Sequence, residues 1–254
     1  NGIPAITDHP LSTVADLDAL PPLAAAAGRI PMVLATARRL QHALPEADVR
    51  VPVAGPFSVA ANLLGFDALL IEAFTNPAAT RAALRHLAEA QAGFVRLVRD
   101  AGLGIAFFES AATPPLLSPE LFRAVALPPL GWLLRAASAI IGRPVPCIMG
   151  GNTAPILEDL LGTGTGYLIC PAPGETDQAA FMATMRSHPA VTVRVNMAPE
   201  ITARGRWPEV QAEVDRIARL VAGRPNTCLG TGALPFETAP ETVRRIGEYA
   251  ATLG

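Results

Sequence analysis

Residues 76–108, NPAATRAALRHLAEAQAGFVRLVRDAGLGIAFF, decide the fold because they contain one complete helix–strand unit. Asn76 is a typical N-cap residue, Pro77 suits the first helical position, and Gly102 suits the residue after a helix. This boundary chemistry predicts a helix over 77–101. The apolar run at 103–108 that follows has the length and composition of a buried strand.

The same alternation recurs along the chain, where short β-rich runs are separated by stretches that are apolar on one helical face. The predicted strands cover 49–54, 103–108, 143–149, 167–170, 190–196 and 226–231. The predicted helices cover 58–73, 77–101, 153–162, 176–187, 207–222 and 240–252, and one more begins at Ser118-Pro119-Glu120. Because almost wholly apolar strands alternate with helices, we expect a parallel sheet covered on both faces.

This pattern is compatible with an open doubly wound sheet and with a closed barrel. No G-x-G-x-x-G or Walker-type motif follows a strand, which weighs against dinucleotide and nucleotide folds. Six βα units are two fewer than a (β/α)8 barrel contains, and residues 1–48 predict helix and loop without a strand.

Composition narrows the classes of partner. The chain has 254 residues, 50% of them hydrophobic, and a formal net charge of -2 without a basic run. It shows no apolar run of about 18 residues and no opening signal peptide. We therefore expect a cytoplasmic protein with no nucleic-acid or membrane partner. The first residue is Asn1 rather than methionine, which we interpret as the start of a piece of a longer chain.

Candidate functional residues are the polar side chains that follow predicted strands, because barrel enzymes carry their chemistry at these ends. Glu109 follows the apolar strand GIAFF and is the best candidate for a catalytic carboxylate, since apolar surroundings raise a carboxyl pKa and favour proton transfer. The alternative is a carboxylate that caps a helix or stabilises a loop.

Cys147 and Met149 lie two residues apart on a predicted strand and therefore point to the same side. Their sulfur atoms suit a soft metal ion, but zinc requires three or four protein ligands. The alternative is packing, which is the common role of a buried cysteine or methionine. None of the four histidines follows a predicted strand: His9, His42, His86 and His188.

An ordered set of short motifs resembles the uroporphyrinogen decarboxylase superfamily, which also holds the zinc-dependent methylcobalamin:coenzyme M methyltransferases. The motifs are Gly55-Pro56-Phe57-Ser58 with Leu64-Gly65, Ser118 to Phe122, Gly150, Val195 to Pro199, Gly230 to Pro235, and Thr238-Ala239-Pro240. The resemblance implies an α/β fold of the (β/α)8 TIM-barrel type over a single domain, 1–254, that lacks its first two strands. A longer chain or a homo-oligomer would supply them.

The methyltransferase branch is closer, because its last strand ends in a T-G-C-x-x-P pattern that Thr231 to Pro235 resembles. In that branch a His-x-Cys pair and the cysteine of this pattern bind zinc, which lowers the thiol pKa of the methyl acceptor. Those three positions are Cys147, Met149 and Ala233 here, so the resemblance implies an incomplete ligand set.

The decarboxylase branch matches less well, because its active-site tyrosine falls on Asn62 and its histidine falls on Thr231. Three hypotheses follow: a methyltransferase supplied by a cobalamin-bearing partner protein, a tetrapyrrole decarboxylase with a rearranged site, and a non-catalytic barrel that binds a corrinoid or a tetrapyrrole. We predict catalytic roles for Glu109 and Cys147, metal binding by Cys147 and Met149, and binding of a small-molecule substrate by Ser58, Asn62, Asn152, Asn196 and Thr231.

Overall fold

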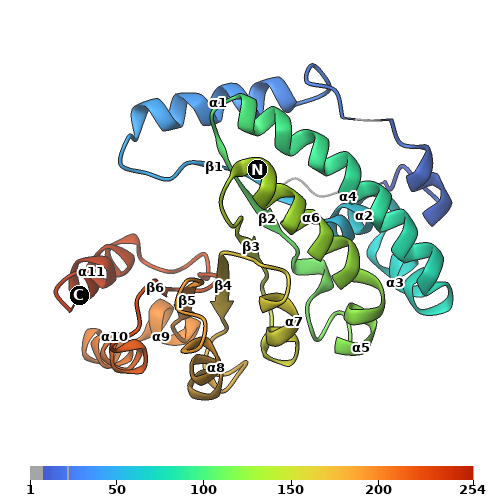
Figure 1. Cartoon of the computed structure of the whole chain (residues 1–254). Coiled ribbons are helices and arrows are strands. Elements are labelled where there is room, and N and C mark those ends of the chain that lie inside the picture. The colour runs from blue at the N-terminus through green and yellow to red at the C-terminus, as the bar shows by residue number, and fades with distance from the viewer. Residues whose placement is uncertain (1–7, 22, 254) are drawn as a thin grey trace. The chain divides into compact units, whose positions relative to one another are not determined.

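A computed structural model describes residues 8–21 and 23–253, so residues 1–7, 22 and 254 of the predicted domain lie outside the description (Figure 1). The chain divides into two compact units. The first comprises Asn1–Met149 and Glu158–Thr165, and the second comprises Gly150–Leu157 and Gly166–Gly254. Each unit is described by itself.

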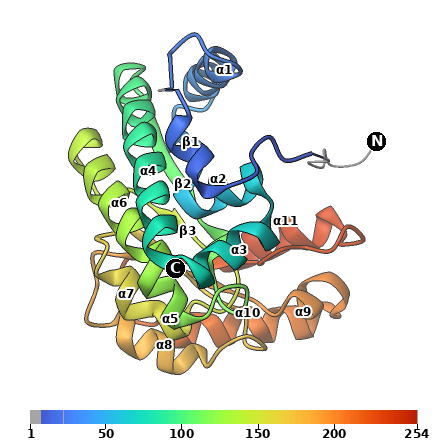
Figure 2. The same ribbon diagram turned by 90° about the vertical axis from the view of Figure 1, so that its right-hand side faces the viewer.

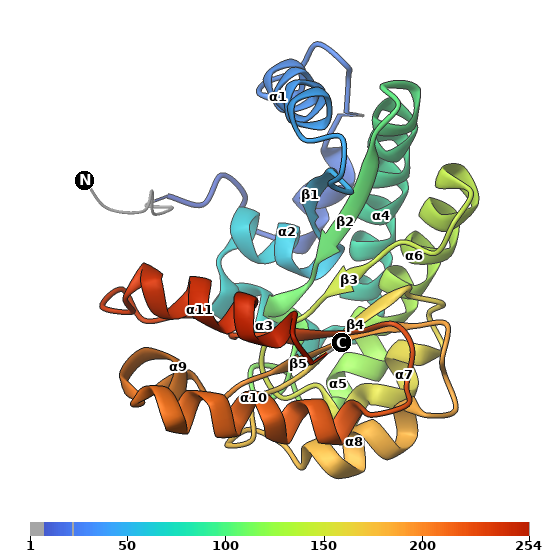
Figure 3. The same ribbon diagram turned by 90° about the vertical axis from the view of Figure 1, so that its left-hand side faces the viewer.

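The first unit is built on a parallel sheet with the strand order β1-β2-β3. Val51 is the register partner of Ile105, and Phe107 is the partner of Cys147. Figure 3 shows β1 and β2 running side by side. The strands are β1 (Arg50–Ala54), β2 (Gly104–Phe108) and β3 (Cys147–Ile148).

Helices surround this sheet, and α4 lies alongside α6 (Figure 2). Their facing sides supply much of the core, including Leu84, Val95, Leu130 and Leu134, which are all fully buried. The elements are η1 (Val14–Ala19), α1 (Ile30–Ala43), α2 (Pro56–Leu64), α3 (Phe66–Thr75), α4 (Pro77–Asp100), η2 (Ser110–Ala112), α5 (Pro119–Leu121), η3 (Phe122–Ala126) and α6 (Leu127–Ile141).

The prediction of one helix over 58–73 was wrong, because α2 and α3 are separate helices that meet at an angle of 116°. Gly65 joins them with φ at +87°, a conformation that glycine adopts without the steric cost of a Cβ. A Cβ at Gly65 would also lie 3.1 Å from the ring of His9. The bend therefore depends on a glycine that the apolar periodicity of the segment conceals.

The expectation that the chain holds no apolar run of about 18 residues was also wrong. The continuous helical stretch Pro119–Ile141 is long and apolar enough to cross a membrane by length and composition, and α2 with α3 passes the same test as a bent pair. Within the first unit, however, this stretch packs against α4, and Leu130, Leu133 and Leu134 are fully buried. Its apolar character is accounted for by a core position.

The second unit contains a second parallel sheet with the order β4-β5-β6. Its strands are β4 (Tyr167–Cys170), β5 (Thr192–Asn196) and β6 (Thr227–Gly230). Its helices are η4 (Ala154–Ile156), α8 (Gln178–Met185), α9 (Pro199–Arg204), α10 (Trp207–Val221) and α11 (Pro240–Ala250), and α7 (Leu157–Leu161) follows η4 directly in the chain.

All the predicted strands form, all of them are parallel, and the α/β class is confirmed. The described residues before β1 hold η1 and α1 and no strand, as predicted. Two details differ from expectation. The segment 153–162 divides into a 3-10 turn and a short α-helix, and α9 was not predicted.

Candidate functional site

The carboxyl group of Glu109 lies at the N-terminus of α2. Glu109 follows β2 directly and is fully buried. Its Oε2 accepts a hydrogen bond from the backbone N–H of Phe57 at 3.0 Å, and its Oε1 accepts one from the N–H of Ser58 at 2.7 Å. The hydroxyl of Ser58 donates to the same Oε1 at 2.5 Å. Glu109 therefore caps the helix with a side chain 52 residues away from Phe57 in sequence.

Gly55, the N-cap residue of α2, makes this arrangement sterically possible. A Cβ at this position would overlap the carboxyl group of Glu109. The N–H of Gly55 donates to the carbonyl oxygen of Phe108 at 2.7 Å, which holds the start of α2 against the end of β2. The G-P-F-S motif therefore serves as a socket for the carboxyl group that follows the neighbouring strand.

Opposing influences act on the pKa of Glu109. Burial raises it from 4.5 to about 7, because an ionised carboxylate loses its hydration there. The hydrogen bonds from Ser58 and Phe57 oppose this rise, and the positive end of the helix dipole acts in the same direction as those bonds. Desolvation dominates, so Glu109 titrates near neutral pH.

The other predicted residues of α2 differ in their exposure. Ser58 is half-buried, and its hydroxyl also accepts a hydrogen bond from the N–H of Ala111 at 3.2 Å. Asn62 lies one turn further along the same helical face and is exposed, while its carbonyl oxygen accepts a hydrogen bond from Nδ1 of His9 at 3.0 Å. Ser58 is thus held in place by protein groups, whereas the amide of Asn62 reaches solvent.

Cys147 and Met149 are both buried in the first unit. The backbone N–H of Cys147 donates to Oγ1 of Thr165 at 3.0 Å. Burial raises the pKa of the Cys147 thiol far above its ordinary value, and the charge of Glu109 adds to the rise. The thiol is therefore protonated at neutral pH. This environment agrees with the packing interpretation, and the catalytic assignment of Cys147 stays a prediction.

The predicted residues of the second unit gather where β5 and β6 end. Asn196 ends β5 and is 8% exposed, and a Cβ at Gly230, the last residue of β6, would overlap its side chain. The half-buried Thr231 follows Gly230 directly. Asn152 lies apart in sequence, and its Oδ1 accepts the N–H of Ala154 at 3.2 Å, which stabilises a local turn.

Sequence analysis missed a buried polar network that fixes the ends of β4 and β5. The amide nitrogen of Gln178 donates to the carbonyl oxygens of Pro171 at 2.6 Å and Asn196 at 2.8 Å. Arg216 donates to Oε1 of Gln178 at 2.7 Å and pairs with Glu213, whose Oε1 accepts the N–H of Ala198 at 3.2 Å. The signal was the i, i+3 spacing of Glu213 and Arg216 on a helix that buries one face.

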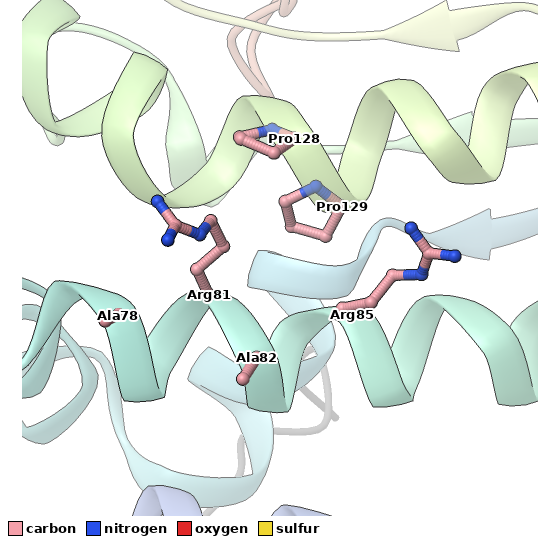
Figure 4. A pocket seen from close by; sticks show the side chains of 6 residues that line it. All are labelled: Ala78, Arg81, Ala82, Arg85, Pro128 and Pro129. Carbon is pink, nitrogen blue, oxygen red and sulfur yellow. The ribbon is translucent and has the colours of Figure 1, made fainter.

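Figure 4 shows a hollow between α4 and α6 with a volume of about 320 Å³. Its two arginines are engaged by neighbouring groups. Arg81 donates to the carbonyl oxygen of Ala124 at 3.3 Å, whereas Arg85 pairs with Glu89 at 2.8 Å and lies over the ring of Trp132. The lining holds none of the predicted site residues: Ala78, Arg81, Ala82, Arg85, Pro128 and Pro129. We therefore do not assign the candidate site to this hollow.

The residues present do not fit a zinc ion. Within residues 8–21 and 23–253, no group of three or more histidine, cysteine, aspartate or glutamate side chains is arranged to hold a metal. Cys147 is a buried, protonated thiol, Met149 offers only a weak thioether, and Ala233 has no donor atom. Both carboxyl oxygens of Glu109 already accept hydrogen bonds from the N-terminus of α2.

Comparisons with known proteins show the family through a family model and the fold through a solved structure. The sequence matches the family model described as uroporphyrinogen decarboxylase (URO-D) over residues 1–253. A comparison with curated proteins gives no significant match. Among solved structures, a methyltransferase from Methanosarcina mazei is similar with a TM-score of 0.78 at 22% sequence identity, over 99% of this chain and 73% of that chain.

Both matches imply a barrel of the TIM type, while closure of the barrel and the absence of its first two strands stay predictions. The motifs that carry the resemblance lie within the matched range, from Gly55 to Pro240. The chain belongs to the uroporphyrinogen decarboxylase family.

Proposed function

We propose that this protein is a methyltransferase of the corrinoid-linked type that binds a small-molecule substrate at the carboxyl ends of its strands. The observation that carries the proposal is the contact between Asn196 and the segment that begins at Gly230 and continues as T-G-A-L-P from Thr231 to Pro235, similar to the ending of the methyltransferase branch. The similarity in fold to the Methanosarcina mazei methyltransferase supports the same conclusion.

The geometry around Asn196 suits recognition of a polar substrate group. The N–H of Met197 donates to the carbonyl oxygen of Gly230 at 2.7 Å, which ties the two strand ends together. Gly232 has φ at +69°, and a Cβ there would lie 3.8 Å from the amide nitrogen of Asn196. We propose that the amide of Asn196 and the hydroxyl of Thr231 bind the substrate, with Asn152 as a further polar contact.

In the first unit, Glu109 acts in this proposal as a positioning residue. Its carboxyl group fixes the N-terminus of α2, and with it Ser58 and the exposed Asn62 one turn on. Direct proton transfer by Glu109 would require access to a side chain that is fully buried. Asn62 is the group on this helix that is available to a substrate.

The methyl donor in the proposal is a methylated corrinoid carried by a partner protein, which supplies an electrophilic methyl group. Because the zinc ligand set does not fit, the proposal includes no metal-activated step. A cytoplasmic location and association of several copies are part of the same proposal and follow from sequence and family resemblance.

The experiment is anaerobic incubation of the purified protein with methylcobalamin and a small thiol such as coenzyme M. Loss of methylcobalamin and gain of methylated thiol in equal amounts are expected. Asn196→Ala is expected to lower kcat/KM by about tenfold, because one substrate hydrogen bond is lost. Thr231→Val tests the second contact, and Thr252→Val near the C-terminus is the matched control, expected to have no effect.

Other results of the same assays would support the two alternative functions. Release of carbon dioxide from uroporphyrinogen would replace methyl transfer with decarboxylation, the activity for which the family model is named. Tight binding of methylcobalamin without turnover of any thiol, together with stable uroporphyrinogen, would establish a non-catalytic binding protein. Equal activity of wild type, Asn196→Ala and Thr231→Val would contradict the site but leave methyl transfer standing.

A further inference from the structure

One face of the sheet in the second unit carries a polar side chain or a thiol on each of its three strands, together with the buried apolar Ile169. Ile169, Arg194 and Cys228 are register partners, so their side chains share this face. Two residues before Ile169 lies Tyr167, and two residues after Arg194 lies Asn196. We call Tyr167, Arg194, Asn196 and Cys228 the polar face. The other face carries the buried apolar side chains of Leu168, Val193 and Val195, while Thr227 and Leu229 on β6 are half-buried.

Arg194 is unusual because it is the only charged residue in the interior of a described strand. It is half-buried, and no ion pair between described residues includes it. A partly desolvated cation without an anionic partner carries an electrostatic cost. The cost is relieved when an anion binds from outside the chain.

The neighbours of Arg194 orient its guanidinium group. Its Nε donates to Oδ1 of Asn196 at 3.1 Å, and its aliphatic stem crosses Gly230, where a Cβ would lie 2.7 Å from both Cγ and Cδ of Arg194. The hydroxyl of Tyr167 interacts with both Arg194 and Cys228. Glycine at 230 therefore leaves room for a side chain that is aligned by polar contacts rather than by an opposite charge.

We propose that the polar face binds the oxyanion group of the substrate, a carboxylate, sulfonate or phosphate, through Arg194 with Tyr167 and Asn196 beside it. A planar guanidinium whose Nε is already bound presents its two Nη groups as a donor pair that matches two oxygens of such a group. This inference deepens the proposed function by naming the substrate class, and it makes Arg194 a specificity-determining residue that the sequence analysis did not select.

Cys228 provides a reporter of binding that needs no methyl donor. It is exposed, whereas the other two cysteines, Cys147 and Cys170, are buried. An anion on Arg194 would cover the thiol and remove the electrostatic support that Arg194 gives to its thiolate. Alkylation of Cys228 by iodoacetamide, followed by peptide mass spectrometry, should therefore slow in the presence of a bound oxyanion.

The experiment measures this rate at constant pH and ionic strength, with acetate, methanesulfonate or inorganic phosphate replacing chloride. We expect saturable protection of Cys228 by at least one of these anions in the wild type. In Arg194→Gln the half-protecting concentration should rise about tenfold or more, because a charge-assisted hydrogen-bond pair is lost. Arg219→Gln on the exposed side of α10 removes the same charge elsewhere and should behave as wild type.

A second variant keeps the test decisive if Arg194→Gln does not fold. Arg194→Lys retains the charge but loses the fork of donors, so protection should weaken without disappearing. No protection by any anion in the wild type would overturn the inference, as would equal protection in wild type and Arg194 variants. Methyl transfer without protection of Cys228 would contradict only the oxyanion site. Protection of Cys228 without methyl transfer would contradict only the proposed function.

Discussion

The hydroxyl of Ser58 and the carboxyl group of Glu109 form a 2.5 Å hydrogen bond, and the N–H of Ser58 reaches the same oxygen at 2.7 Å. The residue that follows β2 thus accepts hydrogen bonds from the first free N–H groups of α2, the helix that follows the neighbouring strand β1. These groups would otherwise lack partners in the interior, where an unpaired donor is costly. The pair joins the end of β2 to the start of α2.

The titration of Glu109 predicts how stability varies with pH. The pKa of this carboxyl group is about 7 in the folded protein, whereas its ordinary value is 4.5. The folded state therefore holds a proton that the unfolded state has released, and stability falls as pH rises between these two values. The fall should be roughly 3 kcal/mol. Urea unfolding at a series of pH values measures it.

In Glu109→Gln this fall in stability should be absent, because the amide does not titrate. Near pH 4.5, where the native carboxyl group is protonated, the variant should be less stable than the wild type. Glu158→Gln, at an exposed position of α7, serves as the matched control and should keep the wild-type profile. A wild type whose stability rises across the same pH range would show that the hydrogen bonds, rather than burial, dominate the pKa of Glu109.

Substitution of Gly55 tests the socket that receives this carboxyl group. Gly55→Ala places a methyl group where the Glu109 side chain lies, so we expect a loss of about 1–3 kcal/mol in the free energy of unfolding. Gly93→Ala is the matched control, because nothing lies within 4 Å of a Cβ at this position of α4. Alanine favours a helix over glycine by about 1 kcal/mol, so this control should gain stability. Equal effects at both positions would contradict the socket.

Glu213 should matter for stability through the network that holds β4 and β5. Its side chain is 6% exposed and accepts hydrogen bonds from Arg216 and from the N–H of Ala198. Glu213→Ala should cost about 2 kcal/mol, since charge-assisted bonds are lost and the backbone donor is stranded. Chemical denaturation measures the loss. Glu209→Ala removes an exposed pair with Arg206 and a hydrogen bond from the Arg206 N–H on the same helix, and it should cost less because these exposed groups regain hydrogen bonds to water. Comparable losses would argue that burial of the network contributes nothing beyond exposed pairing and capping.

The strands and most helix boundaries could be predicted because they depend on local chemistry. Asn76, Pro77 and Gly102 mark the ends of α4, and each predicted strand overlaps an observed one. The bend at Gly65 could not be predicted in this way. Both halves of that segment are apolar and helical, whereas the glycine between them is favoured by its positive φ and by the close approach of His9, which is distant in sequence.

The site was predictable in part for the same reason. Glu109 follows an apolar strand and Asn196 lies at the end of another strand, so both could be selected from sequence order alone. That Glu109 would cap α2, however, depends on a partner 51 residues away. The network of Gln178, Glu213 and Arg216 likewise joins α8 and α10, which are far apart in sequence. Arg194 was not selected from the sequence because it lies within a predicted strand rather than at its end, and its place beside Cys228 on the same face depends on the strand register.

The metal content of the purified protein tests the ligand argument. Zinc binding to Cys147 would require a thiolate, but burial and the neighbouring Glu109 keep this thiol protonated, and Met149 and Ala233 do not complete a ligand set. Elemental analysis of protein purified without chelators should therefore find no stoichiometric zinc.

The variant Cys147→Ala should leave the metal content unchanged. Its free energy of unfolding should fall by about 1 kcal/mol, because a buried sulfur atom is lost from the core. Cys228→Ala, at an exposed position, should leave stability almost unchanged. One zinc ion per chain that disappears in Cys147→Ala but remains in Cys228→Ala would show that a metal displaces the thiol proton, and Cys147 would then return as a catalytic candidate.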